Sequence, residues 1–260
     1  MIPVERLWQL VTAALAMLCV AGGPQRALAS ACRIAAQGDG TVTEVMDART
    51  LRLHDGRELR LTGIEVLQPE GTALAEAALR SLVIGRMVTL HGTSDTPDRY
   101  GRQPALVFAD DSGTSVQAAL LAAGVVANAA NTRDAGCALE LSAAESRARR
   151  GKSGIWAGSA IKNAESQGDI LARVGQFTLV EGKVLSVRQA GTITYINFER
   201  RWTQDFTVII SRRALPLVES SGMPVKSLEG KTVLVRGWVK ARGGPRIEVF
   251  DAGQIAFGDR

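Results

Sequence analysis

Short segments in which apolar and polar residues alternate recur along this chain, and turn residues separate them. The clearest case is Leu51–Val66, where Asp55-Gly56 stands between two alternating runs and predicts a tight hairpin. Three helices interrupt this pattern, over residues 73–83, 115–123 and 139–150, and Thr72 and Ser115 are placed to cap the first two. The chain is therefore expected to be α+β and mainly β.

A second set of short strands begins at Gly175. Five strands with a helical turn around Leu215–Ser221 between the third and the fourth follow the order of an OB-fold, although SH3-like barrels can imitate it. The expected strands are Phe177–Val187, Thr192–Phe198, Phe206–Ile210, Thr232–Lys240 and Ile247–Phe250.

Periodicity is weak between the two sets, over Ala157–Arg173, which is typical of a linker or a short helix. We expect a first domain over residues 30–157, a linker over 158–174 and an OB-like β-barrel over 175–260.

The first 29 residues have the order of a secretory signal peptide. An apolar run, Leu10–Ala21, follows a start that carries Arg6, and Ala27-Leu28-Ala29 resembles a cleavage site. The run is shorter than the about 20 apolar residues that a membrane anchor needs. The prediction is cleavage after Ala29 and a secreted or periplasmic protein.

Cleavage would leave two cysteines, Cys32 and Cys137. Two cysteines in an exported protein suggest one disulfide, and the alternative is a pair of free thiols. Three Cys and two His in the whole chain are too few for a zinc finger, and His54 and His91 stand in no zinc-hydrolase motif. Catalysis would therefore rest on carboxylates, arginines or hydroxyls.

Charge is divided unevenly along the chain, whose formal net charge is +5. Residues 30–170 carry 15 basic and 17 acidic side chains, whereas residues 171–260 carry 14 basic and 8 acidic ones. An excess of positive charge favours an anionic partner. The second domain is thus expected to provide the main electrostatic contact.

Several motifs of the first domain occur in one order at compatible spacing. They are VTEVMDARTLRL, RLTGIE, DRYGRQPALVFADD, VQAALLAAGVVA and AAESRARRGKSGIW. Together they resemble the thermonuclease, or staphylococcal-nuclease-like, family over residues 40–156. The resemblance implies an OB-like barrel with three helices and, in active members, calcium-dependent hydrolysis of DNA and RNA phosphodiesters.

That chemistry needs oxygen ligands for calcium, a carboxylate that activates water, and arginines that neutralise phosphoryl charge. On the family pattern Arg60 and Arg102 match the two arginines. The family's D-G-D-T turn, whose second Asp is a calcium ligand, reads Asp47-Ala48-Arg49-Thr50 here. A ligand has been replaced by a cation, which would oppose a metal if it pointed inward.

The second acidic motif of the family also differs. Its G-I-D-A-P-E reads Gly63-Ile64-Glu65-Val66-Leu67-Gln68, so that Glu65 keeps a carboxylate and Gln68 takes the position of the catalytic glutamate. An amide cannot accept a proton from water. A two-residue insertion would restore the motif by aligning Pro69-Glu70 with the family's Pro-Glu pair.

These departures favour an exported protein with a degenerate phosphodiesterase site. It would bind nucleic acid or another anionic polymer, with Arg49, Arg60 and Arg102 as phosphate ligands. One alternative is an active calcium-dependent nuclease with Glu65 and Asp47 as metal ligands and Glu70, Arg60 and Arg102 as catalytic residues. Another is an envelope scaffold that binds envelope proteins through both barrels.

In the second domain aromatic and basic residues are interleaved, as in proteins that bind single strands through stacking and charge. Tyr195 and Phe198 are more typical of core positions in alternating strands. Arg201, Trp202 and Arg242 are the candidate nucleic-acid contacts, and Trp202 could equally contact another protein chain.

Overall fold

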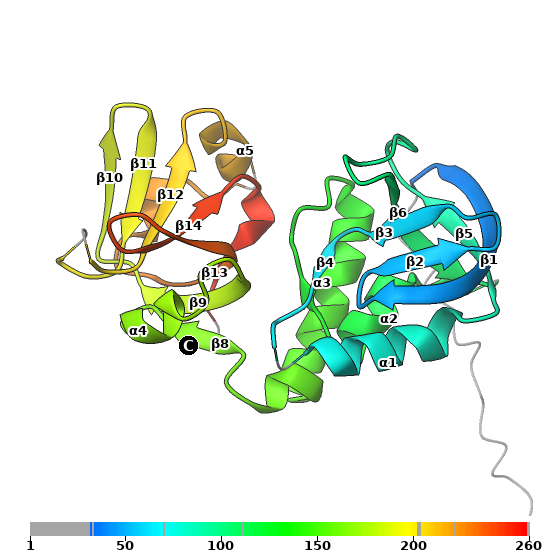
Figure 1. The fold of residues 1–260 in the computed structure, drawn as a ribbon. Helices are drawn as coiled ribbons and strands as arrows, with labels where there is room; N and C mark the ends of the chain where they lie inside the picture. Colours follow the sequence, from blue (N-terminus) through cyan, green and yellow to red (C-terminus); the bar gives the residue numbers. More distant parts are fainter. Residues whose placement is uncertain are drawn as a thin grey trace, which may run out of the picture.

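A computed structural model describes residues 32, 34–69, 71–110, 112–201, 204–220 and 222–258 of the chain. It shows two β-rich domains side by side, joined by a short connection below them in Figure 1. The predicted signal peptide, Glu70 and Trp202 lie outside the described residues. In the described part of the chain, none of the helices has the length and apolar character needed to cross a membrane.

The first domain is built on a closed barrel with the strand order β1-β2-β3-β6-β5. Neighbouring strands are antiparallel except for β3 and β6, which are parallel. The barrel strands are β1 (Ala36–Asp47), β2 (Thr50–Leu53), β3 (Glu58–Leu61), β5 (Met87–His91) and β6 (Arg102–Ala109). A small separate sheet pairs β4 (Ile64–Glu65) with β7 (Ala127–Asn128).

Three helices pack against this barrel, as the sequence predicts: α1 (Thr72–Val83), α2 (Val116–Ala122) and α3 (Ala135–Arg150). Ser115 caps α2, since its side chain accepts a hydrogen bond from the Ala118 amide. Thr72 does not cap α1, because the helix begins at Thr72 itself and the capping position is Gly71. Helix α3 begins four residues earlier than expected, where the Asp134 side chain accepts from the Cys137 amide.

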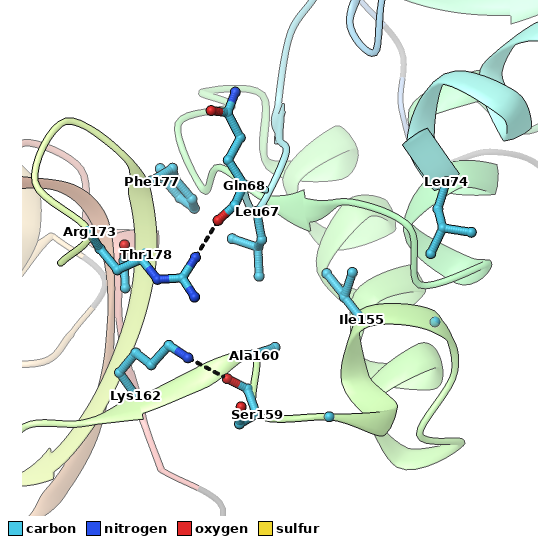
Figure 2. Close-up of a pocket in the computed structure, with 12 residues that line it drawn as sticks. Leu67, Gln68, Leu74, Ile155, Ser159, Ala160, Lys162, Arg173, Phe177 and Thr178 are labelled. Carbon is cyan, nitrogen blue, oxygen red and sulfur yellow. Dashed lines mark hydrogen bonds between the residues drawn. The ribbon is translucent and has the colours of Figure 1, made fainter. Parts of the chain in front are cut away.

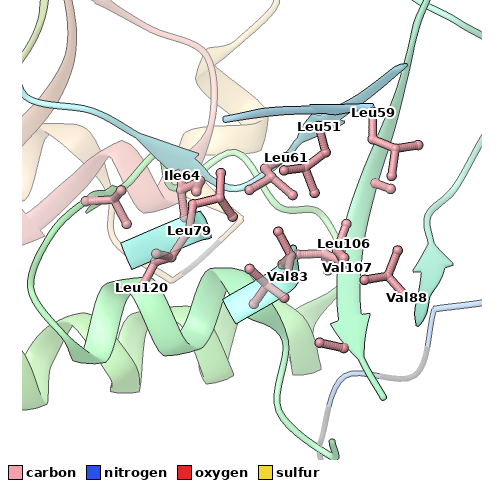
Figure 3. Packing of buried hydrophobic residues seen from close by; sticks show 14 of the residues in the cluster. Leu51, Leu59, Leu61, Ile64, Leu79, Val83, Val88, Leu106, Val107 and Leu120 are labelled. Carbon is pink, nitrogen blue, oxygen red and sulfur yellow. The ribbon is translucent and has the colours of Figure 1, made fainter. Parts of the chain in front are cut away.

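The alternating pattern of the strands places their apolar side chains inside the barrel, where α1 and α2 close its end (Figure 3). The buried residues labelled there are Leu51, Leu59, Leu61, Ile64, Leu79, Val83, Val88, Leu106, Val107 and Leu120. This core holds the strand ends that carry the candidate site.

The second domain has the strand order β10-β11-β12-β14-β13-β9-β8, with β15 added beside β13. β9 and β10 are consecutive in the chain and together correspond to β1 of the first barrel, because β10 pairs with β11 and β9 pairs with β13. β12 and β14 are parallel, like β3 and β6. The order of the first barrel is thereby repeated, with the predicted helical turn, α5 (Leu215–Glu219), between the third and fourth strands. The strands are β9 (Phe177–Lys183), β10 (Ser186–Ala190), β11 (Ile193–Asn197), β12 (Thr207–Ser211), β13 (Thr232–Ala241), β14 (Pro245–Val249) and β15 (Ile255–Phe257).

The segment interpreted as a linker or a short helix has regular structure, and it does include a short helix. It contains β8 (Ile161–Asn163), which pairs in parallel with β9, and α4 (Gln167–Leu171), whose Ile170 is buried in the second core. The connection between the domains is therefore short, and both β8 and α4 belong to the second domain.

Apolar residues of both domains form one buried cluster between them. Trp156, from the 3₁₀ turn Gly154–Ala157 (η2) that follows α3, packs there with Leu67 of the first domain and with Phe177, Leu179 and Leu234 of the second. Such a shared core holds the two barrels in one arrangement.

A buried ion pair accompanies this cluster. Arg236 Nη1 of β13 lies 2.8 Å from Glu145 Oε2 of α3 and donates to the Asn128 carbonyl, also at 2.8 Å. The two charged side chains are 7% and 4% exposed. A charge buried this deeply needs its partner, so the pair defines how the domains dock.

A disulfide joins Cys32 and Cys137, in line with the prediction from the cysteine count. It ties the start of the described chain to α3 across a sequence separation of 105 residues. In the chain-entropy model a loop of this size is worth up to about 4.7 kcal/mol.

Candidate functional site

The barrel brings together five of the residues singled out in the sequence. Asp47 ends β1, Arg49 lies in the turn before β2, and Arg60, Glu65 and Arg102 lie on β3, β4 and β6. Pairing of β2 with β3 sets Thr50 opposite Arg60, and parallel pairing of β3 with β6 brings Arg102 beside the same strand. The side chains thus meet at one end of the barrel because of strand register.

Arg49 points inward and forms an ion pair with Glu65. Its Nη1 atom also donates to the Ile64 carbonyl at 2.7 Å, and the two charged side chains are only 14% and 12% exposed. Burial raises the pKa of Glu65, while the charge of Arg49 acts in the opposite direction. A guanidinium therefore already neutralises the carboxylate that the family pattern assigns to the metal.

Asp47 is held by its own turn and by Arg60. Its Oδ1 accepts from the Arg49 amide at 2.7 Å and its Oδ2 from Thr50 Oγ1 at 2.9 Å. Arg60 Nη1 lies 3.3 Å from both oxygens and 2.9 Å from Thr50 Oγ1. Burial, and then repulsion from Arg49, lower the pKa of Arg60.

Arg102 has a carboxylate partner of its own. Its Nε and Nη2 donate to Asp98 Oδ2 at 3.0 and 2.7 Å, and these bonds lower the pKa of Asp98 to about 2. The guanidinium also lies 4.9 Å from the centre of the exposed Tyr100 ring, which Arg99 approaches at 4.7 Å. Arg102 is thereby oriented along the barrel end.

Each of the three arginines is thus paired with one carboxylate: Arg49 with Glu65, Arg60 with Asp47 and Arg102 with Asp98. Calcium prefers six to eight oxygen ligands with net negative charge. A guanidinium 4 Å from a divalent ion would repel it by about 8 kcal/mol at an effective dielectric constant of 20. The described residues therefore do not fit calcium, and the Asp47 and Glu65 ligand set expected for an active enzyme is engaged within the protein.

Gln68, which takes the position of the family's general base, lies outside the arginine cluster. Gln68 is at the domain boundary, where its main-chain carbonyl accepts a hydrogen bond from Arg173 and its side chain points away from that contact (Figure 2). Among the described residues its amide forms no hydrogen bond with the arginine cluster. Glu70 is outside the described residues, so the alignment with an insertion stays a prediction.

Two of the candidate contacts of the second domain, Arg201 and Arg242, are exposed. The amide of Arg201 donates to buried Asp205 at 2.6 Å, Arg242 is exposed in the turn between β13 and β14, and Trp202 is outside the described residues. The turn that carries Arg242 packs at Gly244 against the main chain of Gln204 and Asp205, so Arg201 and Arg242 lie on adjacent turns.

A groove of about 620 Å³ instead lies along β10 and β11. Arg188, Tyr195 and Arg200 line it, together with one carboxylate, Glu199, and with Ser186, Asn197, Leu185 and Ala190. Arg188 stands directly opposite Tyr195 in the antiparallel pair, so a base and an aromatic ring share one sheet face. Sequence reasoning assigned Tyr195 to the core and gave Arg188 no role; the hairpin register was the signal that would have placed them together.

Residues 59–158 match the model of the family described as staphylococcal nuclease homologue. The match begins within β3 and ends just after η2, and so includes Arg60, Glu65 and Arg102. Comparison with curated proteins gives no match. The first domain of this chain is therefore a staphylococcal-nuclease-like domain.

Proposed function

We propose that this chain is an exported member of the nuclease family that binds nucleic acid, or another anionic polymer of similar charge, without cleaving it. The observation that carries the proposal is the buried pair between Arg49 and Glu65. Arg49 occupies the position of a calcium ligand in the family pattern, and its guanidinium neutralises Glu65 in place of a metal ion.

Hydrolysis requires more than charge neutralisation. A base must activate the attacking water, and positive groups must be free to stabilise the negative charge that builds up on the phosphoryl oxygens in the transition state. The described cluster has three arginines whose charges are already balanced by carboxylates, and an amide takes the place of the family's base. These features support loss of cleavage.

Binding is assigned to the second domain. Its groove combines Arg188 and Arg200 with the ring of Tyr195, the pairing of charge and stacking surface that single strands require. The net positive charge of residues 171–260 also favours an anionic partner for this domain. Contacts to phosphates make such binding strongly dependent on salt.

Export is part of the proposal. Its support is the signal-like order of residues 1–29 together with the disulfide between Cys32 and Cys137, because disulfides persist in oxidising compartments. Cell fractionation, with determination of the first residue of the mature chain, tests it. A cytosolic chain that retains Met1 would contradict it.

The decisive experiment compares cleavage and binding in one preparation. Single-stranded DNA is incubated with the full mature chain in calcium and, separately, in chelator, and affinity is measured by fluorescence anisotropy at several salt concentrations. We expect no cleavage and salt-dependent binding. The double variant Arg188→Ala/Arg200→Ala should weaken binding, whereas Arg213→Ala, an exposed arginine of the same domain outside the groove, should change it little.

Other outcomes would contradict the proposal in different ways. Calcium-dependent cleavage that is lost in Glu70→Gln would show an active nuclease with a rearranged site. Neither cleavage nor binding would favour a scaffold that contacts envelope proteins. Binding with equal losses in both arginine variants would remove the groove from the account.

A further inference from the structure

We propose that Glu199 is a proton switch in the groove along β10 and β11, and that a polynucleotide strand binds there more tightly when this carboxyl carries a proton. The inference rests on the proposed function, because it concerns the regulation of the same groove. Among the described residues that line the groove, Glu199 is the one carboxylate, and Arg188 and Arg200 are the cations. An ionised carboxylate there repels the phosphates that the two arginines attract.

Glu199 stands between the groove and a second hollow. It also lines a neighbouring cavity of about 480 Å³, formed largely by the segment between β11 and β12, together with Arg201 and Asp205. Its side chain forms a hydrogen bond with the side chain of Asp205, which is 1% exposed. Two carboxyl groups in such contact share a proton or repel each other. The position of Glu199 thus connects the charge of the groove to a buried acid.

The contacts of Asp205 decide which of the two acids takes up the proton. Its Oδ2 accepts from the Arg201 amide at 2.6 Å, and its Oδ1 accepts from the side chain of Gln167 in α4. Hydrogen bonds donated to a carboxylate favour its ionised form, so Glu199 is the acid that is protonated. Partial burial, and then the charge of Asp205 and the hydrogen bond to it, raise the pKa of Glu199.

The other charged groups near Glu199 do not reverse this direction. Glu165, in the segment before α4, also raises the pKa of Glu199, whereas the charge of Arg201 opposes the shift as the smallest contribution. On the groove side the titratable and charged neighbours are Arg188, Tyr195 and Arg200. The two histidines of the chain both belong to the first domain. A change in the charge of the groove below neutral pH therefore falls on Glu199.

A bound strand and a bound proton then favour each other. Phosphates in the groove place further negative charge beside Glu199 and raise its pKa again, so that binding takes up a proton. By thermodynamic linkage, protonation raises the affinity for the strand by the same factor, and about tenfold lies in the range usual for coupled ligands. The affinity should be lowest at a pH above the pKa of Glu199 in the free and the bound chain, and it should increase as pH falls through these values.

The test is calorimetry of the full mature chain with oligothymidylate, in pairs of buffers that differ in ionisation enthalpy, between about pH 4.5 and 8. Neither thymine nor the backbone phosphates titrate in this range, so the protons measured are those that the protein binds. We expect net proton uptake on binding and an affinity about tenfold higher at the acidic end. Glu199→Gln keeps an N–H that can donate to Asp205, and it therefore imitates the protonated acid. This variant should bind about tenfold more tightly than the native chain at neutral pH, with little proton uptake.

Asp169→Asn is the matched control, because Asp169 is an exposed carboxylate of the same domain that does not line the groove. This variant should keep the proton uptake and the pH dependence of the native chain. Equal pH dependence in the native chain and in Glu199→Gln would overturn the inference, and so would the absence of proton uptake by the native chain, a result that needs no variant. Binding with the same affinity at every pH overturns the switch alone, whereas absence of binding at every pH refutes the proposed function as well.

Discussion

Replacing Arg49 tests whether its guanidinium stands in for a metal. Arg49→Met keeps a long side chain but leaves the Glu65 carboxylate buried without its cation. Removing one partner of a buried ion pair costs about 3–5 kcal/mol, and the slight exposure of this pair, 14% and 12%, favours the lower end. For a chain of this size about 3 kcal/mol lowers the melting temperature by about 6–12 °C. Calorimetry checks the value.

The same variant should be sensitive to pH, with a definite sign. Burial already raises the pKa of Glu65, and the variant removes the charge that opposes this shift. Folded Glu65 then binds a proton more tightly than the unfolded chain does, so the variant loses stability as pH rises through the folded pKa. The gap from the native protein should be smallest below the ordinary glutamate pKa of about 4.3 and wider at neutral pH.

Arg49→Asp extends the test to metal binding. It places a carboxylate where the family pattern has a calcium ligand, beside Asp47 and Glu65. Without metal this variant should be less stable than Arg49→Met, because like charges then face one another. Calcium at ten times its dissociation constant should restore about 1.4 kcal/mol to this variant alone. An equal calcium response in the native protein and in Arg49→Met, or a stability gap that does not change with pH, would refute the reasoning.

Three further changes follow from the described contacts. Arg236→Ala should destabilise the chain by about 3–5 kcal/mol in chemical denaturation, because Glu145 stays buried without a cation. Adding Glu145→Gln to this variant should recover part of that stability, and a double variant that recovers none would contradict the reasoning. Arg102→Ala should raise the pKa of Asp98, measured by NMR titration, from about 2 towards the ordinary value of about 3.9. In the native protein this pair stabilises the fold above about pH 3.9 and the stabilisation is lost as pH falls towards about 2; the variant should lack this contribution. An unchanged titration of Asp98 would contradict the assignment. Cys137→Ser should lower the free energy of unfolding by up to about 4.7 kcal/mol in non-reducing conditions, as measured by thermal unfolding. After reduction, the variant and the native protein should be equally stable.

Much of the architecture was predictable from the sequence because its causes are local. The Asp55-Gly56 turn forms the hairpin of β2 and β3, and the three helices of the first domain occur where alanine-rich segments predict them. The order of strands around α5 likewise follows from turn residues and alternation. The family motifs also identified Arg60 and Arg102 before their positions in the barrel were known, since a motif preserves spacing along the chain.

The tertiary structure decided which charges meet. Arg49 and Glu65 are paired only because barrel closure and the β4 strand bring their side chains together, and nothing local to Arg49 distinguishes an inward from an outward direction. Arg236 and Glu145 are 91 residues apart and come from different domains, so their pairing exists only after docking. Likewise β8 is a strand because it pairs with β9, and the weak periodicity of its own segment gave no sign of it. Secondary structure follows from neighbours in the chain, whereas the state of this site depends on partners that only folding brings within reach.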